Sequence, residues 1–145
     1  MARLREVSVT VRAYEHGDML ALDRLRAAVY PGEPKRDPRM WWAFPTLVVP
    51  RKAEIIAATT FTLSPDAKRG YVCYGVDHMV HPDHRRQGIG TLLHEERCRI
   101  ARELGAIDFL GTITPDNDAM KAILVASGGR HISSGAGRDF YVVRL

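Results

Sequence analysis

This sequence has few cysteines, and it lacks long apolar runs and a strong excess of one charge. Its 145 residues include 2 cysteines, Cys73 and Cys98, which have neither the spacing of a zinc site nor the number that a disulfide framework needs. No apolar run reaches the roughly 18 residues that a membrane-spanning helix requires, and the first residues lack the apolar centre of a signal peptide. We therefore expect buried free thiols, no metal site, no membrane partner and a cytoplasmic location.

The excess of positive charge is small, because 21 Lys and Arg against 17 Asp and Glu leave a net charge of +4. This balance favours anionic ligands. It does not indicate a nucleic-acid-binding surface, since no basic run is interleaved with aromatic residues. With 46% hydrophobic and 26% charged residues, the chain has a globular composition, and we expect a single domain over residues 1–145.

Hydrophobic periodicity predicts strands and helices in alternation along the chain. Val7, Val9 and Val11 alternate with Ser8, Thr10 and Arg12, which predicts a strand at 7–12, and a helix capped by Asp18 follows. Further helices are expected at 39–44, 89–104 and 119–127, and further strands at 46–49, 54–63, 71–80, 106–113, 131–133 and 140–143. The expected fold class is α/β (α+β), with a mixed sheet and the order βααβββαβαββ.

The most informative stretch joins the strand expected at 71–80 to the helix expected at 89–104. Pro82 ends the strand, because proline has no backbone N–H to donate to a neighbouring strand. The chain then reads Arg85-x-x-Gly88-x-Gly90 and becomes helical, with inward positions expected at Ile89, Leu93, Ile100 and Leu104. Helix N-termini present unpaired N–H groups, and glycines let a ligand approach the backbone closely. The stretch therefore predicts a phosphate-binding turn.

The spacing Arg85-x-x-Gly88-x-Gly90, with Pro82, the strand before it and the helix after it, resembles the coenzyme A pyrophosphate loop of the GNAT superfamily of N-acetyltransferases. The expected order of elements is similar to that of the family over nearly the whole chain. The resemblance implies a GNAT-like fold, in which helices flank a mixed, mostly antiparallel central sheet. It also implies an acyltransferase with acetyl-CoA as its co-substrate.

The resemblance further assigns cofactor-binding residues. Backbone N–H groups of the turn would hold the pyrophosphate, and the end of the preceding strand would pair with the pantetheine arm. Asn117, at the start of the helix expected at 119–127, would cap that helix and contact the same arm. The complete set is Met79, Val80, Arg85, Arg86, Gln87, Gly88, Ile89, Gly90, Thr91 and Asn117.

Acetyl transfer requires that the acceptor amine lose a proton, because a lysine-like amine with a pKa near ~10.4 is charged at neutral pH. By resemblance, the base is a residue of the strand before the turn, or a water that it holds. His78 is the expected general base, since imidazole titrates near neutral pH, and Tyr74 is expected to order a water. Many relatives carry a tyrosine as general acid where this sequence has Leu124. Water or Tyr141 would then protonate the leaving thiolate, or the thiolate would leave unaided.

Two functions fit these features. The first is an acetyl-CoA-dependent N-acetyltransferase that acts on a primary amine by direct attack in a ternary complex, since neither cysteine is placed as a nucleophile. The second is a catalytically degenerate GNAT-like module that binds CoA or a protein partner. The acceptor would be a small-molecule or peptide amine, and Tyr30, Trp41 and Trp42 suggest an aromatic wall for it. Dimerisation is frequent in the family, and the sequence leaves a homodimer open.

Overall fold

The fold is that of a computed structural model, which describes residues 8–68 and 70–145. The elements follow in the order β1 (Arg12–Ala13), η1 (His16–Asp18), α1 (Met19–Val29), α2 (Met40–Ala43), β2 (Thr46–Arg51), β3 (Glu54–Asp66), β4 (Gly70–Val80), η2 (Pro82–His84), α3 (Ile89–Glu103), β5 (Ala106–Ile113), α4 (Asp118–Ala126), β6 (Arg130–Gly135) and β7 (Arg138–Arg144). Among the described residues, no helix is both long enough and apolar enough to cross a membrane.

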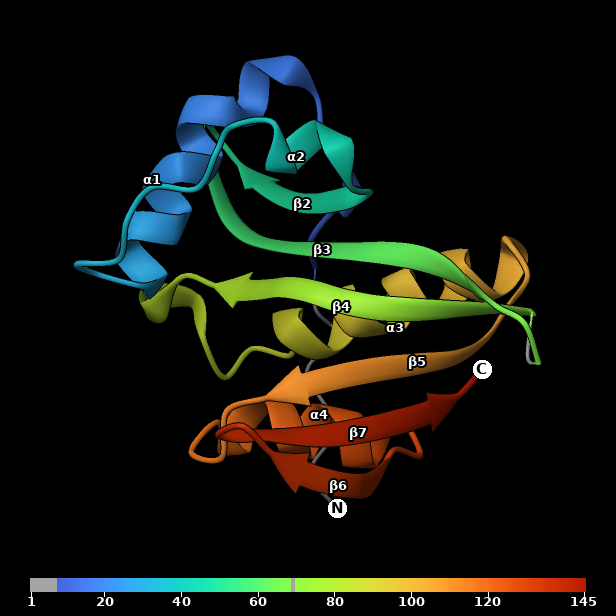
Figure 1. Cartoon of the computed structure of the whole chain (residues 1–145). Helices are drawn as coiled ribbons and strands as arrows, with labels where there is room; N and C mark the ends of the chain where they lie inside the picture. Colours follow the sequence, from blue (N-terminus) through green and yellow to red (C-terminus); the bar gives the residue numbers. More distant parts are fainter. Residues whose placement is uncertain (1–7, 69) are drawn as a thin grey trace. The chain divides into compact units, whose positions relative to one another are not determined.

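The strands form one seven-stranded sheet in the order β1-β2-β3-β4-β5-β7-β6 (Figure 1). β4 and β5 run parallel, and antiparallel pairs join β1 to β2, β2 to β3, β5 to β7 and β6 to β7. Parallel neighbours need a crossover connection, which α3 supplies between β4 and β5. The predicted α/β (α+β) fold with a mixed, mostly antiparallel sheet is confirmed.

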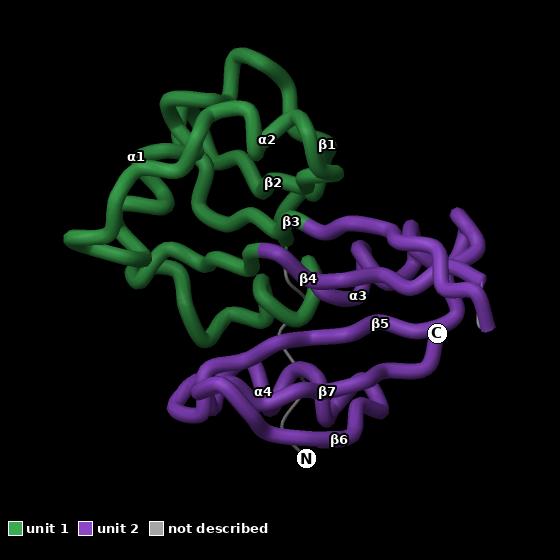
Figure 2. Tube along the Cα trace, in the orientation of Figure 1, with its two compact units in different colours: residues 1–60, 77–93 green, residues 61–76, 94–145 purple. Residues whose placement is uncertain are grey.

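The chain forms two compact units (Figure 2). The first contains the residues up to Thr60 together with Asp77–Leu93, and the second contains Phe61–Val76 and His94–Leu145. The strands β3 and β4 and the helix α3 each continue from one unit into the other. The two units are described separately below.

The core of the first unit lies between helices α1 and α2 and the strands β2, β3 and β4. Its buried members are Leu22, Leu25, Trp41, Val48, Ile55, Ala58 and Met79. Trp41 contributes the largest side chain, and its indole Nε1 donates a hydrogen bond to Asp23 of α1 at 3.2 Å. This hydrogen bond holds the short helix α2 against α1.

The core of the second unit includes a polar pair. The Arg97 guanidinium lies 4.3 Å from the centroid of the buried Phe109 ring, and its Nε donates to Nδ1 of His94 at 3.0 Å. Burial, with a contribution from the Arg97 charge, lowers the pKa of His94 to about 3. The imidazole is therefore neutral at physiological pH and can accept this bond.

Two local predictions are wrong. Residues 8–11 are not in a strand, and the pairing begins instead at Arg12 and Ala13; Val7 lies outside the described residues. Leu104, expected to face inward, is 56% exposed because α3 ends at Glu103. The two errors have the same cause. Hydrophobic alternation and helical periodicity predict which face a side chain takes, but they do not predict the residue at which a strand begins to pair or a helix ends.

Candidate functional site

The C-terminal end of β4 is fixed by local bonds. The His81 N–H donates to the carbonyl of Ile56 at 2.8 Å, and Pro82, which has no N–H, opens the short helix η2. The side chain of His81 accepts a hydrogen bond from the N–H of Asp83 at 3.1 Å. The strand therefore stops where the sequence predicts it, and the chain turns away from the sheet.

Residues 85–88 form the turn between η2 and α3. The backbone is left-handed at two of them, with φ of 62° at Arg86 and 82° at Gly88. Glycine adopts this conformation without strain, whereas arginine does so at a cost. The turn is exposed, but Ile89 directly after it is only 1% exposed, so the buried start of α3 anchors it.

The first turn of α3 leaves backbone donors available. The N–H of Leu92 donates to the Gly88 carbonyl at 3.0 Å, so the helical bonding begins there and helix geometry gives the N–H groups of Ile89, Gly90 and Thr91 no intrahelical acceptor. The helix is 15 residues long, and its N-terminus carries a partial positive charge. Arg85, whose Nε donates to the Val80 carbonyl at 3.1 Å, adds a full charge beside it. This arrangement is suited to an anion.

His78 joins β4 to the first turn of α3. Its Nε2 lies 2.9 Å from the Gly90 carbonyl oxygen, and its Nδ1 lies 2.9 Å from Oγ1 of Thr59 on β3. A carbonyl oxygen only accepts, so Nε2 must carry a proton and donate it. The Thr59 hydroxyl is also 3.1 Å from the Asp77 carbonyl. His78 therefore bonds to the same turn in which the resemblance places the pyrophosphate.

Asp77, the preceding residue, bonds to the connection between α1 and α2. Its Oδ1 accepts a hydrogen bond from Nη2 of Arg36 at 2.8 Å, across 41 residues of sequence. Burial raises the pKa of Asp77, while the nearby Arg36 and Arg26 charges oppose the rise. Arg26 also lies over the ring of Tyr30, 5.1 Å from its centroid. The buried carboxylate thus lies among cations and fastens the connection to β4.

The predicted site residues fall into both units. His78, Met79, Val80 and the turn residues 85–91 lie together in the first unit, whereas Tyr74 and Asn117 belong to the second. The Met79 side chain is fully buried, and Tyr74 is 38% exposed. Asn117 caps α4, since its side chain accepts from the N–H of Met120 at 3.1 Å. The cap predicted at Asn117 is therefore present.

Of the three aromatic residues considered for an acceptor wall, Trp41 and Trp42 line one pocket, and Tyr30 is not among its lining residues. Trp41 is 1% exposed in the core, whereas Trp42 is 56% exposed on the surface. Trp42 lines a pocket beside the N-terminal end of α1, and Tyr30 follows its C-terminal end. Adjacent positions on a helix point in different directions, which separates the two tryptophans.

Sequence reasoning missed two features of these units. In a regular strand Asp77 points to the opposite face from His78, and the sequence does not reveal which loop the Asp77 side chain meets there. His94 and Arg97, which were not predicted to be core residues, are 1% and 2% exposed. His94, Arg97 and Ile100 follow one another at intervals of three residues, which places them on the same side of the helix. This spacing is the signal from which their burial could have been predicted.

The family of the chain follows from comparison with known proteins. The model of the Acetyltransferase (GNAT) family matches residues 17–124, and no curated protein sequence matches significantly. Ribosomal-protein-alanine N-acetyltransferase from Brucella melitensis is 20% identical, with a TM-score of 0.74 over 94% of this chain and 99% of that one.

Two further solved structures share the fold. Arabidopsis thaliana Naa50, in complex with the bisubstrate analogue CoA-Ac-MVNAL, is 16% identical, with a TM-score of 0.75 over 96% of this chain and 99% of that one. The putative acetyltransferase yncA from Salmonella typhimurium, with its cofactor acetyl-CoA, is 18% identical, with a TM-score of 0.71 over 95% and 93%. These likenesses show the fold, and the family model spans well over half of the sequence. The chain belongs to the GNAT family of acetyltransferases.

Proposed function

We propose that this protein transfers the acetyl group of acetyl-CoA to a primary amine, by direct attack in a ternary complex. One observation carries the proposal: an exposed turn, left-handed at Arg86 and Gly88, opens the 15-residue helix α3. Membership of the GNAT family supports it. So do the structures of relatives that hold acetyl-CoA or a bisubstrate analogue of it.

The residues of the turn fit a pyrophosphate. The N–H groups of residues 86–90 would donate to its oxygens, and Arg85 and Arg86 would balance its charge. Gly88 has a φ of 82°, so the position favours the one residue that also lets a phosphate approach the backbone. Bound in this way, acetyl-CoA would supply an activated acetyl thioester.

The end of β4 would orient the thioester. β4 pairs with β5 from Tyr71 to Tyr74, and we assign the pantetheine arm to the backbone further along β4, at Met79 and Val80. The side chain of Met79 is buried in the core, which fixes the backbone at this point. An N–H of Met79 or Val80 would donate to the carbonyl oxygen of the thioester as negative charge develops on it.

His78 would hold the first turn of α3 in place and would not act as the general base. Its Nε2 donates to the Gly90 carbonyl, and its Nδ1 faces the Thr59 hydroxyl. A general base needs a free lone pair within reach of the acceptor. We therefore assign His78 to positioning the first turn of α3, and Tyr74, 38% exposed, to ordering the water that takes the proton.

The acceptor would be a small molecule or a peptide with a free amine. Two structures with the same fold support a peptide acceptor: the NatC complex bound to Gag peptide and CoA, and Arabidopsis thaliana Naa50 in complex with the bisubstrate analogue CoA-Ac-MVNAL. One feature favours the alternative of a degenerate module that binds CoA without turnover. Leu124 is fully buried in α4, at the position where many relatives have a tyrosine as general acid.

The first experiment measures thermal unfolding with and without acetyl-CoA, for the wild type, a Gly88→Glu variant and a Gly105→Glu control. Gly105 also has a positive φ, 96°, and follows the opposite end of α3, so the control carries the same strain and added charge. At a hundred times the dissociation constant, binding adds about 2.7 kcal/mol, which raises Tm by several degrees.

We expect the shift in the wild type and the control, and its loss in Gly88→Glu. A wild type without a shift would overturn the proposed cofactor site. Where the shift is present, release of free thiol in the presence of an amine panel distinguishes the enzyme from the degenerate module, because the module binds acetyl-CoA without releasing thiol.

A further inference from the structure

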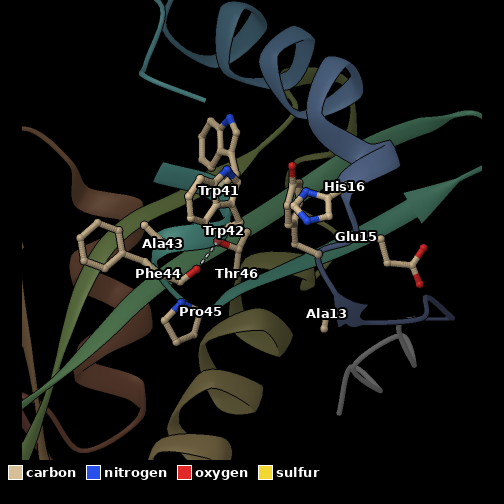
Figure 3. A pocket seen from close by; sticks show the side chains of 10 residues that line it. Ala13, Glu15, His16, Trp41, Trp42, Ala43, Phe44, Pro45 and Thr46 are labelled. Carbon is tan, nitrogen blue, oxygen red and sulfur yellow. Dashed lines mark hydrogen bonds between the residues drawn. The ribbon is translucent and has the colours of Figure 1, made fainter. Parts of the chain in front are cut away.

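A pocket of about 430 Å³ opens in the first unit, lined by residues that precede α1 and by residues of α2 and the start of β2 (Figure 3). It is lined by Ala13, Tyr14, Glu15, His16, Trp41, Trp42, Ala43, Phe44, Pro45 and Thr46. The 11 residues of α1 separate the lining residues that precede this helix from Tyr30. None of the lining residues belongs to the turn proposed to bind acetyl-CoA.

Aromatic side chains form two walls of this pocket. Tyr14 and His16 stand on one side with ring centroids 6.2 Å apart at a steep angle. Trp42 and Phe44 stand on the other side, where α2 runs into β2 (Figure 3). Trp42 is 56% exposed although its neighbour Trp41 is buried. An indole face left open to solvent beside other rings is available to a ligand.

The lining of the pocket differs in its charged residues from the chain as a whole. Of the ten described residues that line it, none is Lys or Arg and one, Glu15, carries a carboxylate, in a protein with a net charge of +4. The Glu15 side chain is 73% exposed and pairs with Arg12 at 3.9 Å, and it is directed away from the rings in Figure 3. Arg12 also bonds Asp18, at 2.7 and 2.9 Å.

Tyr14 is partly buried and packs against the core of the first unit. Its pKa is raised, chiefly by burial and further by the carboxylates of Asp18 and Asp23. Aromatic faces carry partial negative charge as well, and they attract cations that lie within about 6 Å of a ring centroid. The aromatic rings, and the absence of Lys and Arg from the described lining, favour a cation as the ligand.

We propose that this pocket binds an organic cation, a quaternary or protonated amine with an apolar body. The cation would lie against the indole of Trp42 and the ring of Tyr14, and the Glu15 carboxylate would balance its charge. This site is independent of the proposed acetyl transfer, because none of its lining residues belongs to the turn or to β4.

The pocket contains its own reporter, since both tryptophans of the chain line it. We would titrate the full chain with choline and follow tryptophan fluorescence. The control ligand is 3,3-dimethyl-1-butanol, which has the shape of choline without its charge. We expect a saturable change with choline and binding roughly tenfold weaker with the neutral isostere.

Variants separate the pocket from non-specific effects. Trp42→Leu should weaken choline binding roughly tenfold with little change in Tm, since Trp42 is largely exposed and Trp41 remains to report. Glu15→Gln should weaken it about twofold, as expected for an exposed ion pair. A matched control, Tyr71→Leu, removes an aromatic residue that is 49% exposed on β4 and should leave binding unchanged.

Three outcomes would overturn the proposal. One is equal binding of choline and its neutral isostere, which would show an apolar pocket with no preference for charge. Another is unaltered choline binding in a folded Trp42→Leu variant. The third is the absence of a saturable signal with choline in the wild type. None of these outcomes bears on acetyl-CoA binding.

Discussion

The ion pair between Arg36 and Asp77 provides a sharp test of how the first unit is held together. The side chain of Asp77 is 6% exposed and that of Arg36 is 29% exposed, with 2.8 Å between Nη2 and Oδ1. The second oxygen of Asp77, Oδ2, has no hydrogen-bond partner among the described residues. In an Arg36→Met variant, which keeps the length of the side chain, the buried carboxylate would lose its only bonded cation.

The expected loss follows from the burial of Asp77. Removing one partner of a buried ion pair costs about 3–5 kcal/mol, and the partial exposure of Arg36 places this pair at the lower end, about 3 kcal/mol. For a chain of this size each kcal/mol moves Tm by roughly 2–4 °C. We therefore expect Arg36→Met to lower Tm at pH 7 by several degrees, whereas Arg24→Met, a change at an exposed position of α1, should have almost no effect.

The loss should depend on pH in a definite direction. Burial raises the pKa of Asp77, so the unfolded chain releases this proton at a lower pH than the folded protein does. Between the unfolded and folded pKa values the unfolded state therefore binds fewer protons, and stability falls as pH rises. Without Arg36 the folded pKa rises further, so the deficit of Arg36→Met should be small near pH 4 and largest at neutral pH.

A double variant provides the decisive comparison. Arg36→Met with Asp77→Asn has no buried charge, so much of the lost stability should return, and the cycle should show strong coupling between the two positions. Scanning calorimetry at pH 4.5 and 7 measures both effects. Two results would refute the assignment of a buried, mutually dependent pair. One is an equal loss of stability in Arg36→Met at both pH values, and the other is a double variant whose loss is the sum of the losses in the two single variants.

Three further predictions concern single residues. His78→Gln should keep the acetyl-CoA-dependent shift in Tm and most of kcat, because the glutamine amide can still donate to the Gly90 carbonyl. His78→Leu should lose both the shift and kcat. Loss of kcat alone in His78→Gln would instead indicate that His78 is the general base. Gly129→Ala should destabilise the protein by about 1–3 kcal/mol in urea unfolding, since its Cβ would lie 2.5 Å from the Leu124 carbonyl oxygen. Asn117→Ala should cost about 1 kcal/mol through loss of a helix cap, and Asn117→Asp should retain it; equal unfolding midpoints for the two would argue against the cap.

The turn could be predicted from sequence because its determinants are local. Pro82 ends the strand, Gly88 takes the left-handed conformation, and Ile89 begins a helix with an apolar face. Each of these effects acts within a few residues. The same sequence could not show the partners of His78, because the Thr59 hydroxyl belongs to another strand, 19 residues earlier in the chain.

Long-range polar contacts explain most of what the sequence missed. Arg36 and Asp77 meet across 41 residues, and nothing near either residue indicates the other. Arg97 can be buried because its guanidinium packs on the Phe109 ring and donates a hydrogen bond to the neutral imidazole of His94. Hydrophobic periodicity alone assigns a charged residue to the surface. Hydrophobic patterning therefore predicts the sheet and helices well, and it fails where a buried polar group depends on one distant partner.

Contacts of the neighbouring residues explain how the turn keeps a strained backbone at Arg86. A left-handed arginine costs about 1–3 kcal/mol and persists only where its surroundings fix it. Three contacts do so here: Ile89 is buried, the Arg85 Nε bonds the Val80 carbonyl, and His78 bonds the Gly90 carbonyl. Donors held in this way need no reordering when an anion arrives, so less binding energy is lost. A turn that only connected a strand to a helix would gain nothing from such strain, whereas one that aims several N–H groups at a single ligand would.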